Sequence, residues 1–285
     1  MSFPDLPSFL GQNAKLKGPI ALIFMEDAVE VASTLRHHLA SGFKAVVALG
    51  SPNIEIVKAV QEQIHRIDYD MTVEDALPDA VNAFIKAYPS VWIYYCYNSE
   101  YLFFPFCETR SVGEMAAFAM EERRPHLLTY VVDLYAGDLW SHPNAVSIED
   151  AHLDKSGYYA LARKDAVGEF KDRQLDFFGG LRWRFEEHIP TARRRIDRIA
   201  LFQAKPNLTL LGDHTLNDPE MNTYACPWHH SLTAAIASFR TAKALKRNPG
   251  SSYAIETFKW RNSTKFDWHS QQLMDLGLME PGQWF

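Results

Sequence analysis

Polar side chains that suit ligand binding come directly after two apolar runs near the N-terminus. Glu26 and Asp27 follow the first run, and Ser51 and Asn53 follow the second. Ligands of open parallel sheets bind beyond the carboxyl ends of the strands, where these residues would lie. A carboxylate there can accept hydrogen bonds from a base or a ribose, although Asp27 could instead cap the helix that follows. We therefore predict that these four residues bind a cofactor or co-substrate.

Two later apolar runs also end in polar residues. Tyr97 and Ser99 lie at the end of the third run, just before Glu100, and we predict that they bind the same co-substrate. Asp133 lies near the end of the fourth run, and Asp138 follows it closely. A carboxylate can act as the general base that deprotonates a substrate hydroxyl, so both aspartates are candidate catalytic residues. Capping of local structure is their alternative role.

A pair of arginines follows two adjacent glycines in the second half of the chain. Gly179 and Gly180 would let the backbone approach a ligand closely. Arg182 and Arg184 would point the same way if the segment is extended, because side chains two apart share one face of a strand. Their guanidinium groups suit a phosphate or a carboxylate, so we predict a catalytic role for both. The alternative is a surface ion pair with the glutamates at 186–187.

Histidines in the second half are candidate metal ligands, because imidazole binds zinc and other transition metals. His229 and His230 are adjacent, and adjacent residues on a strand face opposite sides, so both cannot readily bind one metal. We predict a metal site that uses Glu100, His214 and His230. Hydrogen-bonded structural roles are the alternative.

Continuous apolar runs predict the strands that would position these residues. Runs of this kind indicate strands buried on both faces, and they lie at 19–25, 43–49, 91–97 and 126–135. Helical spacing of apolar residues, with cap and breaker residues, predicts helices at 28–40, 54–64, 78–88 and 115–123. Ser111 and Glu114 have the spacing of a capping box before the last of these helices. Alternating strands and helices indicate an α/β fold, with a single, mainly parallel, Rossmann-like sheet.

The pattern loosens after residue 135. Glycines and polar residues indicate a loop-rich section with short strands, one of them at 199–202. Residues 231–246 predict a helix, which Asn248-Pro249-Gly250 would end. We assign residues 1–250 to one domain and expect the aromatic tail, 251–285, to pack on its body.

Composition excludes several classes of protein. The net charge of −6 and the pI of about 6.0 give no basic surface for nucleic acid. Three cysteines without a CxxC pair predict neither a zinc knuckle nor a disulfide framework, so we expect a reducing, cytoplasmic location. We also expect no secretory signal and no membrane span, because no apolar stretch has the required length.

The segments 35–51, 92–102 and 178–185 resemble family 2 glycosyltransferases of the GT-A type, in particular a compact bacterial subgroup. In the second segment, a tryptophan and four apolar residues precede Tyr-Asn-Ser-Glu-Tyr-Leu. The subgroup has Asp-x-Asp-Glu-Phe-Leu at this place. The third segment, Phe-Gly-Gly-Leu-Arg-Trp-Arg-Phe, is similar to the Gly-Gly-x-Arg-x-Arg-Phe segment of the subgroup. The resemblance extends over residues 19–245.

The resemblance implies a GT-A fold that binds a nucleotide-sugar and transfers a hexosyl group to a surface-polysaccharide or small-molecule acceptor. In the subgroup, the two aspartates hold Mg²⁺ or Mn²⁺ against the diphosphate, but Tyr97 and Ser99 replace them here. A phenol with a pKa of about 10 and a neutral hydroxyl are weak ligands for these cations. The sequence therefore predicts a degenerate Asp-x-Asp motif, in which Arg182 and Arg184 could neutralise the diphosphate instead.

Two other functions stay open. Loss of both aspartates is what a GT-A-like binding or scaffold protein without catalytic activity would show. A metal hydrolase is the third candidate, and it would use Asp213, His214, His229 and His230. No HExxH motif or similar spacing accompanies these residues.

Overall fold

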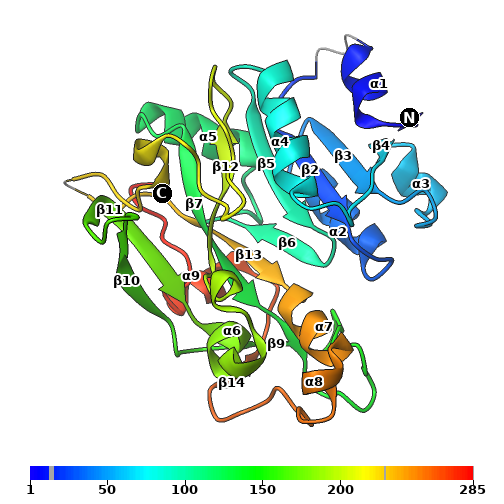
Figure 1. The fold of residues 1–285 in the computed structure, drawn as a ribbon, viewed down its shortest axis with the longest axis vertical. Helices are drawn as coiled ribbons and strands as arrows, with labels where there is room; N and C mark the ends of the chain where they lie inside the picture. Colours follow the sequence, from blue (N-terminus) through cyan, green and yellow to red (C-terminus); the bar gives the residue numbers. More distant parts are fainter. Residues whose placement is uncertain (13–15, 228, 285) are drawn as a thin grey trace. The chain divides into compact units, whose positions relative to one another are not determined.

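The computed structural model describes residues 1–12, 16–227 and 229–284. It is an α/β structure with a large, mostly parallel central sheet flanked by helices (Figure 1), which confirms the predicted fold class at this level. Contacts divide the chain into two compact units. Unit 1 comprises Met1–Leu102, Thr109–Leu128 and Ile199–Asn222, and unit 2 comprises Phe103–Glu108, Thr129–Arg198 and Thr223–Phe285. Among the described residues, no helix combines the length and apolar character that a membrane crossing requires.

The sheet of unit 1 is built from parallel strands that are buried on both faces. Neighbouring strands in order are β1 (Ser2–Phe3), β4 (His65–Asp68), β3 (Ala45–Gly50), β2 (Ile20–Met25) and β5 (Trp92–Tyr97). Every residue of β2, β3 and β5 is buried, which explains their continuous apolar sequences. β12 (Asp197–Gln203) runs antiparallel beside β5, with Gln203 opposite Trp92.

Helices of unit 1 lie largely where the sequence predicts them, except that the helix Leu6–Gly11 was not predicted and the predicted helix at 54–64 is mostly absent. They are α1 (Leu6–Gly11), α2 (Val31–Ala40), α3 (Lys58–Gln61), α4 (Ala76–Ala87) and α5 (Val112–Glu121). The capping box of α5 is present, with Ser111 and Glu114 bonded reciprocally. The predicted helix at 54–64 is wrong, because only the four residues of α3 are helical. Ile54 and Ile56 are both buried while Val57 is exposed, an alternation typical of extended chain.

Strand β4 was not predicted from the sequence. Its residues are His-Arg-Ile-Asp, so no apolar run announces it. Arg66 nevertheless lies buried, because its guanidinium donates hydrogen bonds to three backbone carbonyls. A polar side chain can occupy a buried strand when its donors are satisfied in this way.

Unit 2 contains a second pair of parallel strands. β7 (His126–Asp133) pairs with β13 (Ala234–Ser238), from Thr129 opposite Ala234 to Asp133 opposite Ser238. The predicted helix at 231–246 is therefore wrong in its first half, where β13 lies. Its second half is confirmed as α7 (Arg240–Arg247), which ends at Asn248 as predicted. Three of the five residues of β13 are alanine, which favours helix locally. Burial of all five residues beside β7 outweighs that local preference.

The other elements of unit 2 are short. β8 (Tyr135–Ala136), β9 (Ala151–Asp154) and β14 (Ser263–Lys265) form an antiparallel sheet, and β10 (Tyr159–Lys164) pairs with β11 (Phe170–Phe178). Helices are α6 (Gly180–Arg184), α8 (Pro249–Ser252) and α9 (Ser270–Asp275), and 3-10 turns lie at Glu186–His188 and Thr191–Arg193. In unit 1, a further 3-10 turn lies at Pro219–Asn222, and β6 (Glu100–Phe103) follows β5. Phe258, Phe266, Leu273 and Trp284 of the aromatic tail are buried.

Candidate functional site

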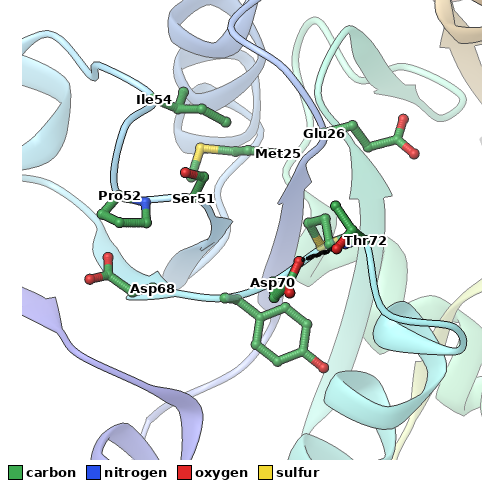
Figure 2. A pocket seen from close by; sticks show the side chains of 10 residues that line it. Met25, Glu26, Ser51, Pro52, Ile54, Asp68, Asp70 and Thr72 are labelled. Atoms are coloured by element: carbon green, nitrogen blue, oxygen red, sulfur yellow. Dashed lines mark hydrogen bonds between the residues drawn. The ribbon is translucent and has the colours of Figure 1, made fainter.

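A cavity of about 420 Å³ opens in unit 1 where β2, β3 and β4 end (Figure 2). Its volume falls in the range of small-molecule sites, which is roughly 300–1,000 Å³. The lining residues lie at the ends of these strands and in the segments that follow them, and they are Met25, Glu26, Ser51, Pro52, Ile54, Asp68, Tyr69, Asp70, Met71 and Thr72. Glu26 and Ser51, which the sequence predicts as binding residues, are among them.

The cavity is lined by hydrogen-bond acceptors and apolar groups. Glu26, Asp68 and Asp70 contribute carboxylates, and none of the described lining residues is a lysine or an arginine. Figure 2 shows the carboxylates of Glu26 and Asp68 pointing in different directions. In the part of the chain that the structure describes, no group of three or more His, Cys, Asp or Glu side chains could hold a metal ion. The arrangement suits a ligand rich in hydroxyl and N–H donors.

Asp68 is the carboxylate of the cavity that is most available to a ligand. It lies half-buried at the end of β4. Within residues 1–12, 16–227 and 229–284, its side chain has no hydrogen bond or ion pair. Asp70 differs, because its Oδ1 accepts from the backbone N of Thr72 at 2.9 Å and from its Oγ1 at 2.7 Å. These bonds lower the pKa of Asp70 and fix the turn that closes the cavity.

The loop after β3 is held in place by Arg66. Its Nη2 donates to the carbonyl oxygens of Ser51 at 3.1 Å, Pro52 at 2.9 Å and Ile54 at 2.7 Å. Asn53, a predicted binding residue, is exposed and donates its backbone N–H to Ser51 Oγ at 3.3 Å. Arg66 therefore fixes the backbone that places Ser51 at the cavity. Asn53 lies in the turn and does not line the cavity.

Gly50 is required where β3 passes the end of β2. A Cβ atom at this position would lie 2.8 Å from the Cβ and the carbonyl oxygen of Met25. Only a glycine therefore lets the two strand ends approach closely enough to share one cavity wall.

The acidic turn after β2 is fixed by Asn98. The Oδ1 of Asn98 accepts the backbone N–H of Glu26 at 2.9 Å. Its Nδ2 donates to Asp27 Oδ1 at 2.7 Å and to the carbonyl of Val29 at 2.8 Å. Asp27 also accepts the backbone N–H of Val29, and the N-cap of α2 is Glu30. Asp27 is thus a turn residue here, and it is not the cap of α2.

The Tyr97–Glu100 turn is closed by its own hydrogen bonds. Glu100 Oε2 accepts the backbone N–H of Tyr97 at 2.9 Å, and Ser99 Oγ donates to the carbonyl of Val29 at 2.9 Å. Ser99 has a φ of 62° and, like Glu100, is fully buried. One carboxylate engaged in this way, beside a phenol and a hydroxyl, does not fit Mg²⁺ or Mn²⁺, which prefer several free anionic oxygens. These residues hold the turn to the β2–α2 loop.

Asp133 and Arg182, two predicted catalytic residues, meet in unit 2. Asp133 Oδ2 accepts the backbone N–H of Arg182 at 3.3 Å, and Oδ1 lies 3.5 Å from Arg182 Nε. The carboxylate is fully buried; burial raises the pKa of Asp133, and the Arg182 guanidinium opposes this shift. Arg182 also donates to the carbonyl of Arg195 at 2.6 Å and to Thr241 Oγ1 at 3.1 Å. Arg182 is therefore committed to contacts inside unit 2, whereas Asp133 Oδ1 is buried without a hydrogen bond to a described residue.

Arg184 contacts a different carboxylate. Its Nη1 lies 3.1 Å and 3.2 Å from the two oxygens of Asp154, and its Nη2 donates to the carbonyl of Phe258 at 2.8 Å. The segment is the short helix α6, so the expectation of an extended segment with both arginines pointing the same way is wrong. Asp154 is buried and also accepts from Tyr135 Oη at 2.6 Å and Trp260 Nε1 at 2.7 Å. The pair joins α6 to β9 and the tail.

Asp138 is the exposed member of the two candidate bases. Its Oδ1 accepts the backbone N–H of Trp140 at 2.9 Å, and its Oδ2 accepts from Ser141 Oγ at 2.7 Å. The hydrogen bond from Ser141 is the main cause of its lowered pKa, so the carboxylate is ionised near neutrality. Asp138 is accessible, but it already stabilises a turn.

The candidate histidines fall in both units. In unit 1, His214 Nδ1 hydrogen-bonds Tyr95 Oη at 3.1 Å, and the two rings stack. Asp213 Oδ1 accepts from the backbone N and Oγ1 of Thr215. In unit 2, His230 is exposed, and its backbone pairs with Ala225. These contacts fit the structural alternative for Asp213 and His214.

Asp68, Asp70 and Arg66 were missed in the sequence because β4 was missed. The signal was present: each of the other parallel strands of this edge is followed by polar residues, and Asp68-Tyr69-Asp70 repeats that pattern. A comparison with protein-family models finds no match, and a comparison with curated protein sequences finds none either.

Proposed function

We propose that the protein binds a nucleotide-sugar through the cavity of unit 1 and acts as a glycosyltransferase-like protein. The observation that carries this proposal is the position and chemistry of that cavity. It lies at the carboxyl ends of parallel strands, which is where open α/β sheets bind nucleotides. The sequence resemblance to GT-A enzymes also supports it.

The charge of the lining indicates which part of the ligand the cavity would take. Three carboxylates without a lining cation would repel a diphosphate. A nucleoside offers ribose hydroxyls and base N–H groups to Asp68 and Ser51, and it offers a flat apolar face to Met25 and Ile54. We therefore place the nucleoside in the cavity and the diphosphate outside it.

Binding is tested by calorimetry with UDP-glucose, GDP-mannose and dTDP-glucose, using the full chain. Asp68→Asn should weaken binding of the preferred nucleotide-sugar about tenfold or more, because a hydrogen bond to a charged acceptor contributes roughly 1.5–3 kcal/mol. Asp267→Asn, an exposed aspartate of unit 2, is the matched control and should bind as the unmodified protein does. Equal affinity in both variants, or no binding of any donor, would contradict the proposal.

Sugar transfer would need a base that deprotonates the acceptor hydroxyl. Asp138 and Asp133 are the predicted candidates; Asp138 is exposed and an acceptor can reach it, whereas Asp133 is fully buried beside Arg182. Loss of a general base typically lowers kcat by about 10²- to 10⁴-fold, so Asp138→Asn and Asp133→Asn identify it by their turnover.

We propose no metal-dependent step, because the oxygens of Ser99 and Glu100 are used in hydrogen bonds that stabilise the Tyr97–Glu100 turn. EDTA should leave transfer unchanged, and strict Mn²⁺ dependence would contradict this.

A binding or scaffold protein without turnover is the second candidate. The contacts of the Tyr97–Glu100 turn favour it, because they use the oxygens that a catalytic metal would need. Donor hydrolysis and transfer assays separate the two candidates. Saturable donor binding without any product would support the scaffold.

A further inference from the structure

A second cavity of unit 1, of about 480 Å³, lies at the opposite edge of the same sheet. One wall is the end of α4 with Asn82, Ile85, Lys86 and Pro89, and the other is the loop 205–209 that follows β12. Because β12 is antiparallel to β5, with Gln203 opposite Trp92, this loop lies where β5 begins. The candidate nucleotide cavity lies where the parallel strands end. The two cavities are therefore separate.

Hydrogen bonds fix both walls of this second cavity. Asn82 Nδ2 donates to the carbonyl of Leu210 at 3.0 Å, and Asn82 Oδ1 accepts its N–H at 2.7 Å. Asn217 accepts the N–H of Thr209 at 2.9 Å and donates to the carbonyl of Asn207 at 2.9 Å. The loop is thus tied to the helix and to the following segment, and the cavity is preformed, as ligand sites usually are.

The lining combines positive charge with an apolar floor. Lys86 and Lys205 supply two ammonium groups, and none of the described lining residues carries a carboxylate. Lys205 is paired with Asp218, whereas the Lys86 ammonium has no ion pair or hydrogen bond with a described residue. Ile85 and Leu208 are buried beside the prolines at 89 and 206.

We propose that this cavity binds a small organic anion with an apolar body. The anionic head would pair with the exposed ammonium of Lys86, and Lys205 would add a weaker attraction because Asp218 already offsets its charge. The body would cover the exposed rings of Pro89 and Pro206 and remove them from water, above the buried Ile85 and Leu208. The inference does not depend on the proposed nucleotide-sugar site.

Phenyl phosphate, benzoate, benzyl alcohol and inorganic phosphate serve as probes for the full chain, with binding followed through the backbone amide NMR signals of residues 207–209. We expect phenyl phosphate or benzoate to shift these signals, and the tighter of the two identifies the anionic head. Benzyl alcohol lacks the charge and inorganic phosphate lacks the body, so each should bind at least tenfold more weakly.

Lys86→Ala should weaken binding of the preferred probe about threefold to fivefold, the range expected for one partly exposed charge pair. Alanine is compatible with the last turn of α4, so the variant should fold. Lys58→Ala is the matched control, because Lys58 is an exposed lysine on α3. Equal binding by both variants, equal affinity for benzyl alcohol or inorganic phosphate, or no shift at residues 207–209 would each overturn the proposal.

Discussion

Asp68 of the unit 1 cavity differs from the carboxylates of the unit 2 interior in its hydrogen bonding. Asp68 lines a cavity and has no partner among the described residues, whereas Asp154 is buried and accepts from three side chains. Asp133 is likewise buried against Arg182. Acidic residues beside arginines and glycines look catalytic in a sequence, but here that combination joins elements of the interior.

The largest effect on stability is expected for Asp154→Ala. This change leaves the Arg184 guanidinium buried without its carboxylate and removes the acceptor of Tyr135 and Trp260. Loss of one partner of a buried ion pair costs about 3–5 kcal/mol of unfolding free energy. Urea unfolding, followed by tryptophan fluorescence, measures the change. Asp172→Ala is the control, because Asp172 is exposed and its one ion pair with a described residue is to its neighbour Arg173. Similar losses of unfolding free energy in both variants would contradict the difference between interior and surface carboxylates.

Asn98→Ala should lower the unfolding free energy by about 2 kcal/mol and also weaken nucleotide-sugar binding. The side chain makes three hydrogen bonds to the β2–α2 loop, and buried groups left without a partner cost roughly 1–3 kcal/mol each. Binding should weaken because Glu26 loses its fixed position. Calorimetry and urea unfolding report the two effects separately. Stability lost without any change in affinity would mean that the loop does not contribute to the site.

Asp133 and Asp138 should contribute to the free energy of unfolding with opposite pH dependences. Burial raises the pKa of Asp133 above its ordinary 3.8, so its protonated form stabilises the fold. This contribution is present below the unfolded-state pKa and is lost as the pH rises through the folded-state pKa. Asp133→Asn removes the titration, so its unfolding free energy should increase relative to the unmodified protein as the pH rises from about 4.

Asp138→Asn should show the reverse trend. Hydrogen bonds lower the pKa of Asp138, so its contribution is present above the unfolded-state pKa and is lost as the pH falls through the folded-state pKa. The variant should therefore lose stability relative to the unmodified protein as the pH rises through the same region. Urea unfolding at several pH values between 3 and 7 measures both variants. Parallel curves would show that their environments do not differ as described.

The smallest effect on stability is expected for Asp68→Asn, below about 0.5 kcal/mol, because no described residue bonds its side chain. The same variant should have the largest effect on nucleotide-sugar affinity. Thermal unfolding without ligand checks the first expectation, and calorimetry checks the second. A large loss of unfolding free energy would show that Asp68 stabilises the fold as the interior carboxylates do.

The sequence predicts the central strands of this protein well, but it predicts polar and alanine-rich strands poorly. β2, β3, β5 and β7 follow from continuous apolar runs. β4 is held by a buried arginine whose three acceptors are distant in the sequence, and β13 is rich in alanine. Tertiary contacts determine that both segments form strands, and a local sequence pattern carries no information on those contacts.

The same two reasons explain which residues of the candidate site could be predicted from the sequence. Glu26 and Ser51 were found because they follow apolar strands, and Asp68 was missed with β4. The different partners of Arg182 and Arg184 depend on the short helix α6, whose Gly180 lies against Asp133: a Cβ atom there would be 3.0 Å from Asp133 Oδ2. Gly180 thus indicates close approach to a carboxylate of the protein, and Gly179 indicates close approach to the ring of Tyr158.

The bond between Asn98 and the Glu26 amide has a consequence for how the cavity opens. The two residues are 72 positions apart in the sequence, so this bond forms only when β5 has joined β2. The Val29 amide, by contrast, is bonded to Asp27 two residues away. In hydrogen exchange, the Glu26 amide should exchange only when β5 separates from the sheet, while the Val29 amide should follow local openings. The side of the cavity formed by Glu26 then opens only as often as β5 separates from the sheet.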